Sequence, residues 1–229
     1  MIDVTGNWHA VSARVAAAAR RADRAPESIR IIAAAKTKSV EIIEAAIAAG
    51  ATDIGENYVQ EAAEKIRRIT SPVTWHLIGH LQRNKAARAV ELFQLIHTLD
   101  SVALGEALAR HAEHLAQPGR VLVEVNIGGE STKHGVAPAQ VATLLAALAP
   151  QRGLLIDGLM AIPPPGPSAE SARSHFRALR ELRDRLRPAA PANAPLRELS
   201  MGMTDDFEVA IEEGATMVRV GRAIFGERT

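Results

Sequence analysis

Lys36 stands at the end of an unbroken run of apolar residues, 31–35, and just before a segment with helical periodicity, residues 40–49. Such a run is typical of a strand that is buried on both faces, as in parallel sheets. The lysine is therefore expected where the strand leaves the core. Burial disfavours an ammonium ion, and a neutral amine can attack a carbonyl carbon to form an imine. A lysine that only snorkels from a strand end is the competing interpretation.

Two glycine-containing turns near the C-terminus, residues 200–204 and 219–223, each follow a predicted strand. Turns of this kind after the last two strands of a barrel are typical phosphate sites. The hydroxyl of Ser200 and the main-chain amides near Gly202 and Gly221 would favour a dianion.

The competing interpretation of these turns is structural, with ordinary turn glycines and Thr204 as the N-cap of a helix that starts at Asp205. Two such turns on neighbouring strands, facing a lysine on the first strand, favour the phosphate site. An imine-forming lysine together with a phosphate site describes a pocket for pyridoxal phosphate.

The rest of the chain alternates strand-like and helix-like segments. Strands are expected over residues 29–35, 52–55, 73–78, 95–98, 120–126, 154–160, 196–200 and 216–220, and helices over 8–22, 40–49, 57–69, 84–92, 102–115, 139–148, 168–187 and 205–213. This alternation predicts an α/β fold, a single (β/α)8 TIM-type barrel domain over residues 1–229. The extra N-terminal helix is expected to close the outer ring, because little chain follows the eighth strand.

Composition narrows the function classes. The net charge of +1 and the 3% of aromatic residues argue against a nucleic-acid partner. The absence of cysteine excludes disulfides and thiolate sites, and the eight histidines show no tight ligand spacing, so no metal is expected. Without a signal peptide or a membrane-length apolar run, the chain is expected to be cytoplasmic and without a membrane partner. The even balance of charges and the absence of an obvious exposed apolar stripe favour a monomer.

Five ordered motifs cover the chain: Ala35–Lys38, Gly55–Glu61, Trp75–Lys85, Ser200–Met203 and Val218–Gly226. They resemble the pyridoxal phosphate homeostasis protein family. The resemblance implies a barrel similar to the N-terminal domain of alanine racemase, with the vitamin B6 cofactor held as a Schiff base on Lys36. It also implies a carrier, buffer or regulator of intracellular pyridoxal phosphate without established turnover, for which apo-enzymes that use the cofactor are conceivable partners.

The cofactor-binding residues that follow from the turns and the resemblance are Lys36, Asn57, His80, Ser200, Met201, Gly202, Arg219 and Gly221. Arg219 could face the pyridine nitrogen, where a permanent cation opposes protonation, or the phosphate, and analogy with alanine racemase favours the nitrogen. Asn57 could instead cap a helix, and His80 could be structural. The family often has threonine or serine where this chain has Arg222, which puts one hydroxyl contact to the phosphate in doubt.

An amino-acid racemase is the alternative function. Racemisation needs acid–base groups on both faces of the bound amino acid, and Lys36 could serve one of them. The sole tyrosine, Tyr58, follows the second strand, and no second domain is expected to supply another. This favours a binding protein without catalytic residues. A barrel that binds another phosphorylated metabolite without a covalent bond is a third option.

Overall fold

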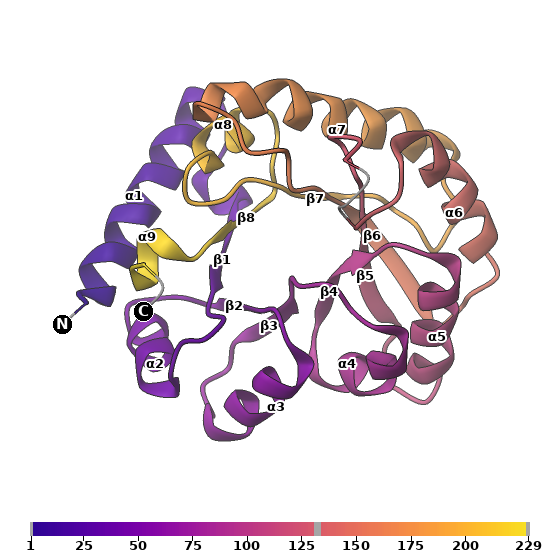
Figure 1. Ribbon diagram of the computed structural model, residues 1–229, viewed down its shortest axis with the longest axis horizontal. Coiled ribbons are helices and arrows are strands. Elements are labelled where there is room, and N and C mark those ends of the chain that lie inside the picture. The colour runs from indigo at the N-terminus through magenta and orange to yellow at the C-terminus, as the bar shows by residue number, and fades with distance from the viewer. Residues whose placement is uncertain (1, 131–133, 228–229) are drawn as a thin grey trace.

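The computed structural model describes residues 2–130 and 134–227, and in them eight parallel strands form a closed barrel inside a ring of helices (Figure 1). The strands are β1 (Arg30–Ala34), β2 (Asp53–Glu56), β3 (Thr74–Leu77), β4 (Leu95–Leu99), β5 (Gly119–Glu124), β6 (Leu154–Met160), β7 (Glu198–Ser200) and β8 (Met217–Val220). Each strand pairs with the next along the chain, and β8 pairs with β1. The predicted TIM-type barrel is confirmed.

The helices lie outside the strands, and the first one precedes β1. They are α1 (Val4–Arg21), α2 (Val40–Ala48), α3 (Val59–Arg68), α4 (Ala86–Leu92), α5 (Val102–Ala112), α6 (Val141–Leu148), α7 (Arg173–Leu186), α8 (Phe207–Glu212) and α9 (Arg222–Phe225). Helix α1 packs against α2, α8 and α9 (Figure 1), so the N-terminal helix closes the ring as predicted. No helix in the described ranges is long and apolar enough to cross a membrane.

The seventh strand and the long helix before it are both shorter than the sequence pattern suggested. The seventh strand begins at Glu198, because Leu196 adopts a left-handed conformation with φ +47° that a strand cannot include. The helix predicted from residue 168 starts as a 3₁₀ turn, Ala169–Ala172, before α7 begins at Arg173. Both differences affect element ends, where local backbone geometry overrides the apolar pattern.

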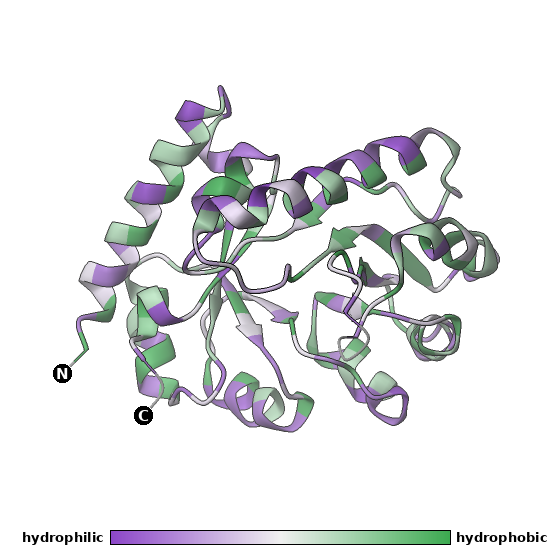
Figure 2. Ribbon diagram, turned by 45° about the horizontal axis from the view of Figure 1, so that its top comes forward, coloured by the Kyte–Doolittle hydropathy of each residue, from purple (hydrophilic) through white to green (hydrophobic). Residues whose placement is uncertain are grey.

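Apolar side chains fill two regions, one inside the barrel and one between the strands and helices. The inner group consists of Ile32, Leu95, Leu122, Met160 and Met217, all buried. Figure 2 shows helices that alternate between green and purple along their length, as expected for amphipathic helices that cover a barrel. The strands are therefore buried on both faces, which explains their continuous apolar sequences.

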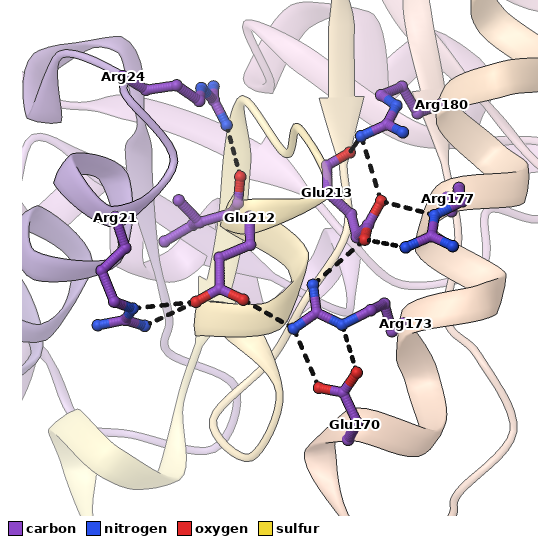
Figure 3. Close-up of polar contacts among 9 residues, drawn as sticks. Arg21, Arg24, Glu170, Arg173, Arg177, Arg180, Glu212 and Glu213 are labelled. Carbon is purple, nitrogen blue, oxygen red and sulfur yellow. Dashed lines mark hydrogen bonds and ion pairs between the residues drawn. The ribbon is translucent and has the colours of Figure 1, made fainter.

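Charged residues join α1, α7 and α8 on the outside of the barrel (Figure 3). Glu212 pairs with Arg21 at 2.9 Å and with Arg173 at 2.7 Å. Glu213 pairs with Arg173, Arg177 and Arg180 at 3.2, 2.9 and 3.1 Å. We call these six residues the helix ion network.

Candidate functional site

A cavity of about 570 Å³ opens beside the carboxyl ends of β1, β2 and β8. This volume lies within the usual range of small-molecule sites, and the carboxyl ends of the strands are where TIM barrels place them. The charged side chains that line the cavity are Lys36, Lys38, Asp205, Arg219, Arg222 and Glu227. Cations outnumber carboxylates in this group, so the cavity favours an anionic ligand.

Lys36 reaches the cavity from a turn that follows β1. The next residue, Thr37, has φ +63°, which is rare for a β-branched residue. The turn is held by α3, because the Thr37 amide donates to Glu61 Oε1 at 2.7 Å and Lys65 Nζ donates to the Ala35 carbonyl at 3.0 Å. The half-buried Lys36 is thus presented by a constrained segment.

Lys65 holds two carboxylates behind this turn. Its Nζ lies 2.6 Å from Glu56 Oε1 and 2.6 Å from Glu61 Oε1. Burial raises the pKa of Glu56 to about 7, because the loss of solvent outweighs the attraction of the ammonium group. Among the described residues, Glu56 Oε2 has no hydrogen-bond partner. We call Glu56, Glu61 and Lys65 the Lys65 cluster.

Arg219 lines the cavity and connects it by hydrogen bonds to the interior of the barrel. Its Nη2 donates to the Ala161 carbonyl at 3.0 Å, and its Nη1 lies 2.6 Å from Ser200 Oγ. Arg219 is buried, and desolvation lowers its pKa to about 10, so the guanidinium stays charged near neutral pH.

A line of hydrogen bonds runs from Arg219 across the interior of the barrel. Ser200 Oγ lies 2.9 Å from His97 Nδ1, His97 Nε2 lies 3.0 Å from His76 Nδ1, and His76 Nε2 lies 2.8 Å from Asp53 Oδ1. All five side chains are buried. We call Arg219, Ser200, His97, His76 and Asp53 the interior chain.

The protonation states of the side chains in the interior chain follow from their burial and from the hydrogen bonds between them. Desolvation lowers the pKa of His76, which Asp53 only partly opposes, and lowers the pKa of His97 well below its usual value. Burial alone would raise the pKa of Asp53, but hydrogen bonds from His76 and Thr52 lower it overall. Both imidazoles are therefore neutral and Asp53 is ionised.

One set of tautomers satisfies every link of the interior chain. Asp53 accepts from His76 Nε2–H, His76 Nδ1 accepts from His97 Nε2–H, and His97 Nδ1 accepts from the Ser200 hydroxyl. Ser200 Oγ in turn accepts from Arg219 Nη1. These assignments come from the bonding pattern and not from observed hydrogens. Every donor points away from Arg219, so the chain orients the guanidinium at the cavity without neutralising it.

The structure brings together four of the predicted site residues, Lys36, Asn57, Arg219 and Gly221, as lining of the cavity. Asn57 is not the helix cap, because the N-cap of α3 is Tyr58. At Gly221 a Cβ would lie 3.2 Å from the Ala34 carbonyl oxygen, so β1 closely approaches this turn.

The described residues that line the cavity do not include the predicted Ser200, Met201, Gly202 or His80. Ser200 and Met201 are fully buried, and the Ser200 hydroxyl is engaged in the interior chain. Gly202 has φ +92°, and a Cβ there would lie 2.5 Å from the Ala210 Cβ, so the turn and its packing on α8 require glycine. The roles of these residues toward a cofactor stay predictions.

Thr204 does not cap a helix that starts at Asp205, as the sequence had suggested. Helix α8 begins later, and its N-cap Asp206 accepts from the Met203 amide at 2.6 Å. The Thr204 hydroxyl lines the cavity and lies 3.4 Å from the Ala223 amide, which joins the turns after β7 and β8. The correction arises because the chain makes one more turn before α8.

His80 lies at a second, smaller cavity of about 320 Å³, which it lines with Tyr58 and Lys85. Its Nδ1 is 3.4 Å from Asp100 Oδ2, and its ring stacks on His134 with centroids 3.8 Å apart. The contacts of His80 thus lead away from the main cavity, although Asn57 lines both cavities.

Sequence reasoning missed Lys38 as a cavity residue, and Lys65, His76, His97 and Asp53 as groups that support the site. The signal for the histidines was present, because each interrupts an otherwise apolar strand. A fully buried histidine requires a polar partner, and only the fold shows which one it has.

Comparisons with known proteins agree with this architecture. The family described as "Alanine racemase, N-terminal domain" matches residues 7–229. The pyridoxal phosphate homeostasis protein of Pseudomonas aeruginosa is 41% identical over 231 residues, covering 100% of this chain and 97% of the relative. The protein of the same name from Escherichia coli is 39% identical over 232 residues, covering 100% and 98%.

Comparison with solved structures shows the same fold. PipY of Synechococcus elongatus, in a structure with pyridoxal phosphate bound, has a TM-score of 0.82 and 37% identity, covering 94% of this chain and 100% of that one. An alanine racemase from Clostridium difficile has a TM-score of 0.71 at 15% identity, covering 88% of this chain and 56% of that one, and shares the fold. With full-length relatives near 40% identity, the chain belongs to the pyridoxal phosphate homeostasis protein family.

Proposed function

We propose that this chain binds pyridoxal phosphate in the main cavity, through a Schiff base on Lys36, and serves the homeostasis of the cofactor by holding it. The observation that carries the proposal is a half-buried lysine on a constrained turn, at a cavity of suitable size where cations outnumber carboxylates. The names of the relatives and the PipY structure with bound pyridoxal phosphate support it.

The residues present fit the cofactor. Pyridoxal phosphate supplies an aldehyde for an amine and a dianion for donors and cations. Thr204 and Gly221 both line the cavity, after β7 and β8 respectively, and the Thr204 hydroxyl and the Gly221 amide would hold the phosphate. Arg222 stands where the family often has a hydroxyl residue, and its Nε lies 3.1 Å from Glu227 Oε1. A phosphate would compete with that carboxylate for the guanidinium.

Arg219 is proposed to face the ring of the cofactor. Ser200 and the Ala161 carbonyl both act as acceptors toward Arg219, so the arginine keeps its charge and cannot take up a proton. A fixed cation beside the pyridine nitrogen would oppose ring protonation and weaken the ring as an electron sink. This arrangement suits a protein that retains the cofactor.

A holding role is favoured over racemisation by the position of Tyr58. This residue, the sole tyrosine of the chain, is 60% exposed and lines the second cavity. A racemase needs a second acid–base group across the substrate from the lysine. Incubation of the loaded protein with L-alanine should therefore yield no D-alanine by chiral chromatography, and steady formation of D-alanine would instead establish the racemase function.

The binding proposal is tested by absorbance. The purified chain mixed with pyridoxal phosphate should gain the near-ultraviolet or visible band of a Schiff base, and borohydride reduction should fix the cofactor to the peptide that contains Lys36. Lys36→Ala should lose both signals. Lys38→Ala is the matched control, because Lys38 lines the same cavity but donates to the carbonyls of Phe225 and Glu227.

Two outcomes would contradict the proposal. A wild-type protein that gains no band with added pyridoxal phosphate would exclude it. A band that persists in Lys36→Ala but disappears in Lys38→Ala would move the attachment to the second lysine.

A further inference from the structure

The carboxyl ends of β3, β4 and β5 bring together a second group of polar side chains. His80 follows β3, Asp100 follows β4, and His134 lies beyond β5. One possible ligand atom from each of these residues lies within 4.8 Å of the other two. We call the three residues the histidine–aspartate cluster. They are at least twenty positions apart in the sequence, so no local spacing signals the group.

The chemistry of the cluster suits a transition-metal ion. Two imidazoles and a carboxylate are a common donor set for zinc and similar divalent ions, and such a site leaves a coordination position for water. The His80 ring stacks on the His134 ring at an interplanar angle of 9°, while His80 Nδ1 already lies 3.4 Å from Asp100 Oδ2. The two rings and the carboxylate thus lie side by side at the rim, and the nearly parallel rings must turn before both nitrogens can face one ion.

Glu124, at the end of β5, gives an independent indication. Its Oε2 is buried and has no hydrogen-bond partner among the described residues. The carboxylate is also close enough to Asp100 and His134 to interact electrostatically with both. A second carboxylate beside the cluster increases its negative potential, and a bound cation would offset it.

Closure of the cluster on an ion requires small movements. Zinc binds nitrogen and oxygen at about 2.0–2.2 Å, so tetrahedral ligand atoms lie roughly 3.3–3.5 Å apart. The observed spacing of up to 4.8 Å must shrink by about 1–1.5 Å. His80 and His134 are both exposed, and His134 precedes Gly135 with φ +105°, so their rings can rotate without disturbing the core.

We propose that His80, Asp100 and His134 bind one divalent transition-metal ion of the zinc class, with Glu124 as the neighbouring carboxylate. The ion would tie the loop after β5 to the ends of β3 and β4. The site lies beside the second cavity, which shares Asn57 with the main one. None of its ligands is among the described residues that line the main cavity, so the two proposals stand or fall separately.

The test measures binding of Zn²⁺ by calorimetry and of Co²⁺ by its visible ligand-field absorption, on full-length protein stripped with a chelator. The variants are His80→Gln, Asp100→Asn and His134→Gln, and the matched control is His9→Gln, an exposed histidine on α1. Each protein is also measured in combination with Lys36→Ala, because a Schiff base of pyridoxal phosphate can itself chelate metals. Circular dichroism verifies that each variant is folded.

The parent protein should bind one ion per chain, and each cluster variant should weaken binding at least tenfold, since loss of an outer-shell partner alone costs about 10–100-fold. His9→Gln should bind as the parent does. A parent protein that binds neither ion would overturn the proposal. So would equal affinities in the parent, His80→Gln and His134→Gln, because the bound ion would then lie elsewhere.

Discussion

The buried polar groups around the cavity and the helix ion network on the outside differ in how each group is supported. In the interior chain, each side chain bonds to the next at 2.6–3.0 Å, and all are buried. In the helix ion network, Glu213 is itself buried, but it meets three arginines whose side chains are 26%, 52% and 33% exposed. In the interior chain, loss of one side chain interrupts the series of hydrogen bonds. In the helix ion network, Glu213 keeps other partners when one arginine is lost.

This difference predicts where substitutions matter. A buried group that loses its partner keeps the full cost of its desolvation, about 1–3 kcal/mol for a neutral group and more for a charge. An exposed ion pair is screened by water and salt and contributes about 0–1 kcal/mol. The stability of the site should therefore depend on a few buried contacts, although the outer network has more ion pairs.

The largest effect is expected for Lys65→Met. Loss of the ammonium group leaves the buried Glu56 carboxyl and the Ala35 carbonyl each without a donor, and since each lost partner costs about 1–3 kcal/mol, the unfolding free energy should fall by about 3–5 kcal/mol. Urea denaturation near pH 7.5 measures the loss. Lys85→Met, at a lysine that bonds only Gln60 among the described residues, is the control and should cost under about 1 kcal/mol. Equal losses in both variants would remove the distinction between the two regions.

A pH dependence is expected from Glu56, whose pKa is raised from 4.5 to about 7 in the folded protein. Between these values the folded state binds more protons than the unfolded state, so the unfolding free energy contributed by this group falls as pH rises, by up to roughly 3 kcal/mol. Glu56→Gln removes this contribution, so the stability of the variant relative to wild type should be higher at pH 8 than at pH 5.

The measurement for Glu56 is the difference between the wild-type and variant curves of unfolding free energy against pH. His76 and His97 act with the opposite sign, because their lowered pKa values cost stability as pH falls below about 6.5. Their contribution cancels in the difference. Parallel curves for wild type and Glu56→Gln would show that the Glu56 carboxyl is not perturbed.

An intermediate effect is expected for His97→Leu. The substitution leaves His76 and Ser200 each without one buried partner, which should cost about 2–3 kcal/mol in denaturant unfolding. Arg219 also loses the group that fixes its Ser200 contact, so the Schiff-base band should shift in the loaded variant. His111→Leu, at an exposed position on α5, should change neither reading. A stable variant with an unshifted band would show that the interior chain does not position Arg219.

The smallest effect is expected for Arg177→Ala in the helix ion network. Glu213 keeps Arg173 and Arg180, so the melting temperature should fall only slightly, and the loss should vanish near about 1 M salt. Thermal unfolding at low and high salt compares the two conditions. A loss as large as that of His97→Leu, which salt does not reduce, would place this network with the buried groups.

Much of the fold could be predicted from the sequence because a parallel barrel buries both faces of its strands. The run at residues 31–35 showed the first strand and, with it, the position of Lys36. The ends of elements were less predictable. The left-handed Leu196 and the additional turn before α8 depend on contacts that an apolar pattern does not encode.

The site was predictable only in part, for the same reason. Lys36 and Gly221 stood at strand ends, where the fold type itself predicts function. The interior chain that ends at Arg219 is built from β2, β3, β4 and β7, and His80 meets Asp100 after β4 and His134 beyond β5. Such encounters depend on strand order and register, so composition and spacing along one chain cannot show them.

The junction between β7 and β8 has a consequence for how binding would be detected. Within the described residues these strands share one paired position, Ser200 opposite Met217, whereas β5 and β6 share six. A ligand held by the turns that follow both strands would bridge this short junction. Since a ligand that binds only the folded state raises unfolding free energy by RT ln(1 + [L]/Kd), cofactor occupancy would be readable as heat resistance. The melting temperature of the barrel would then serve as a gauge of cofactor supply.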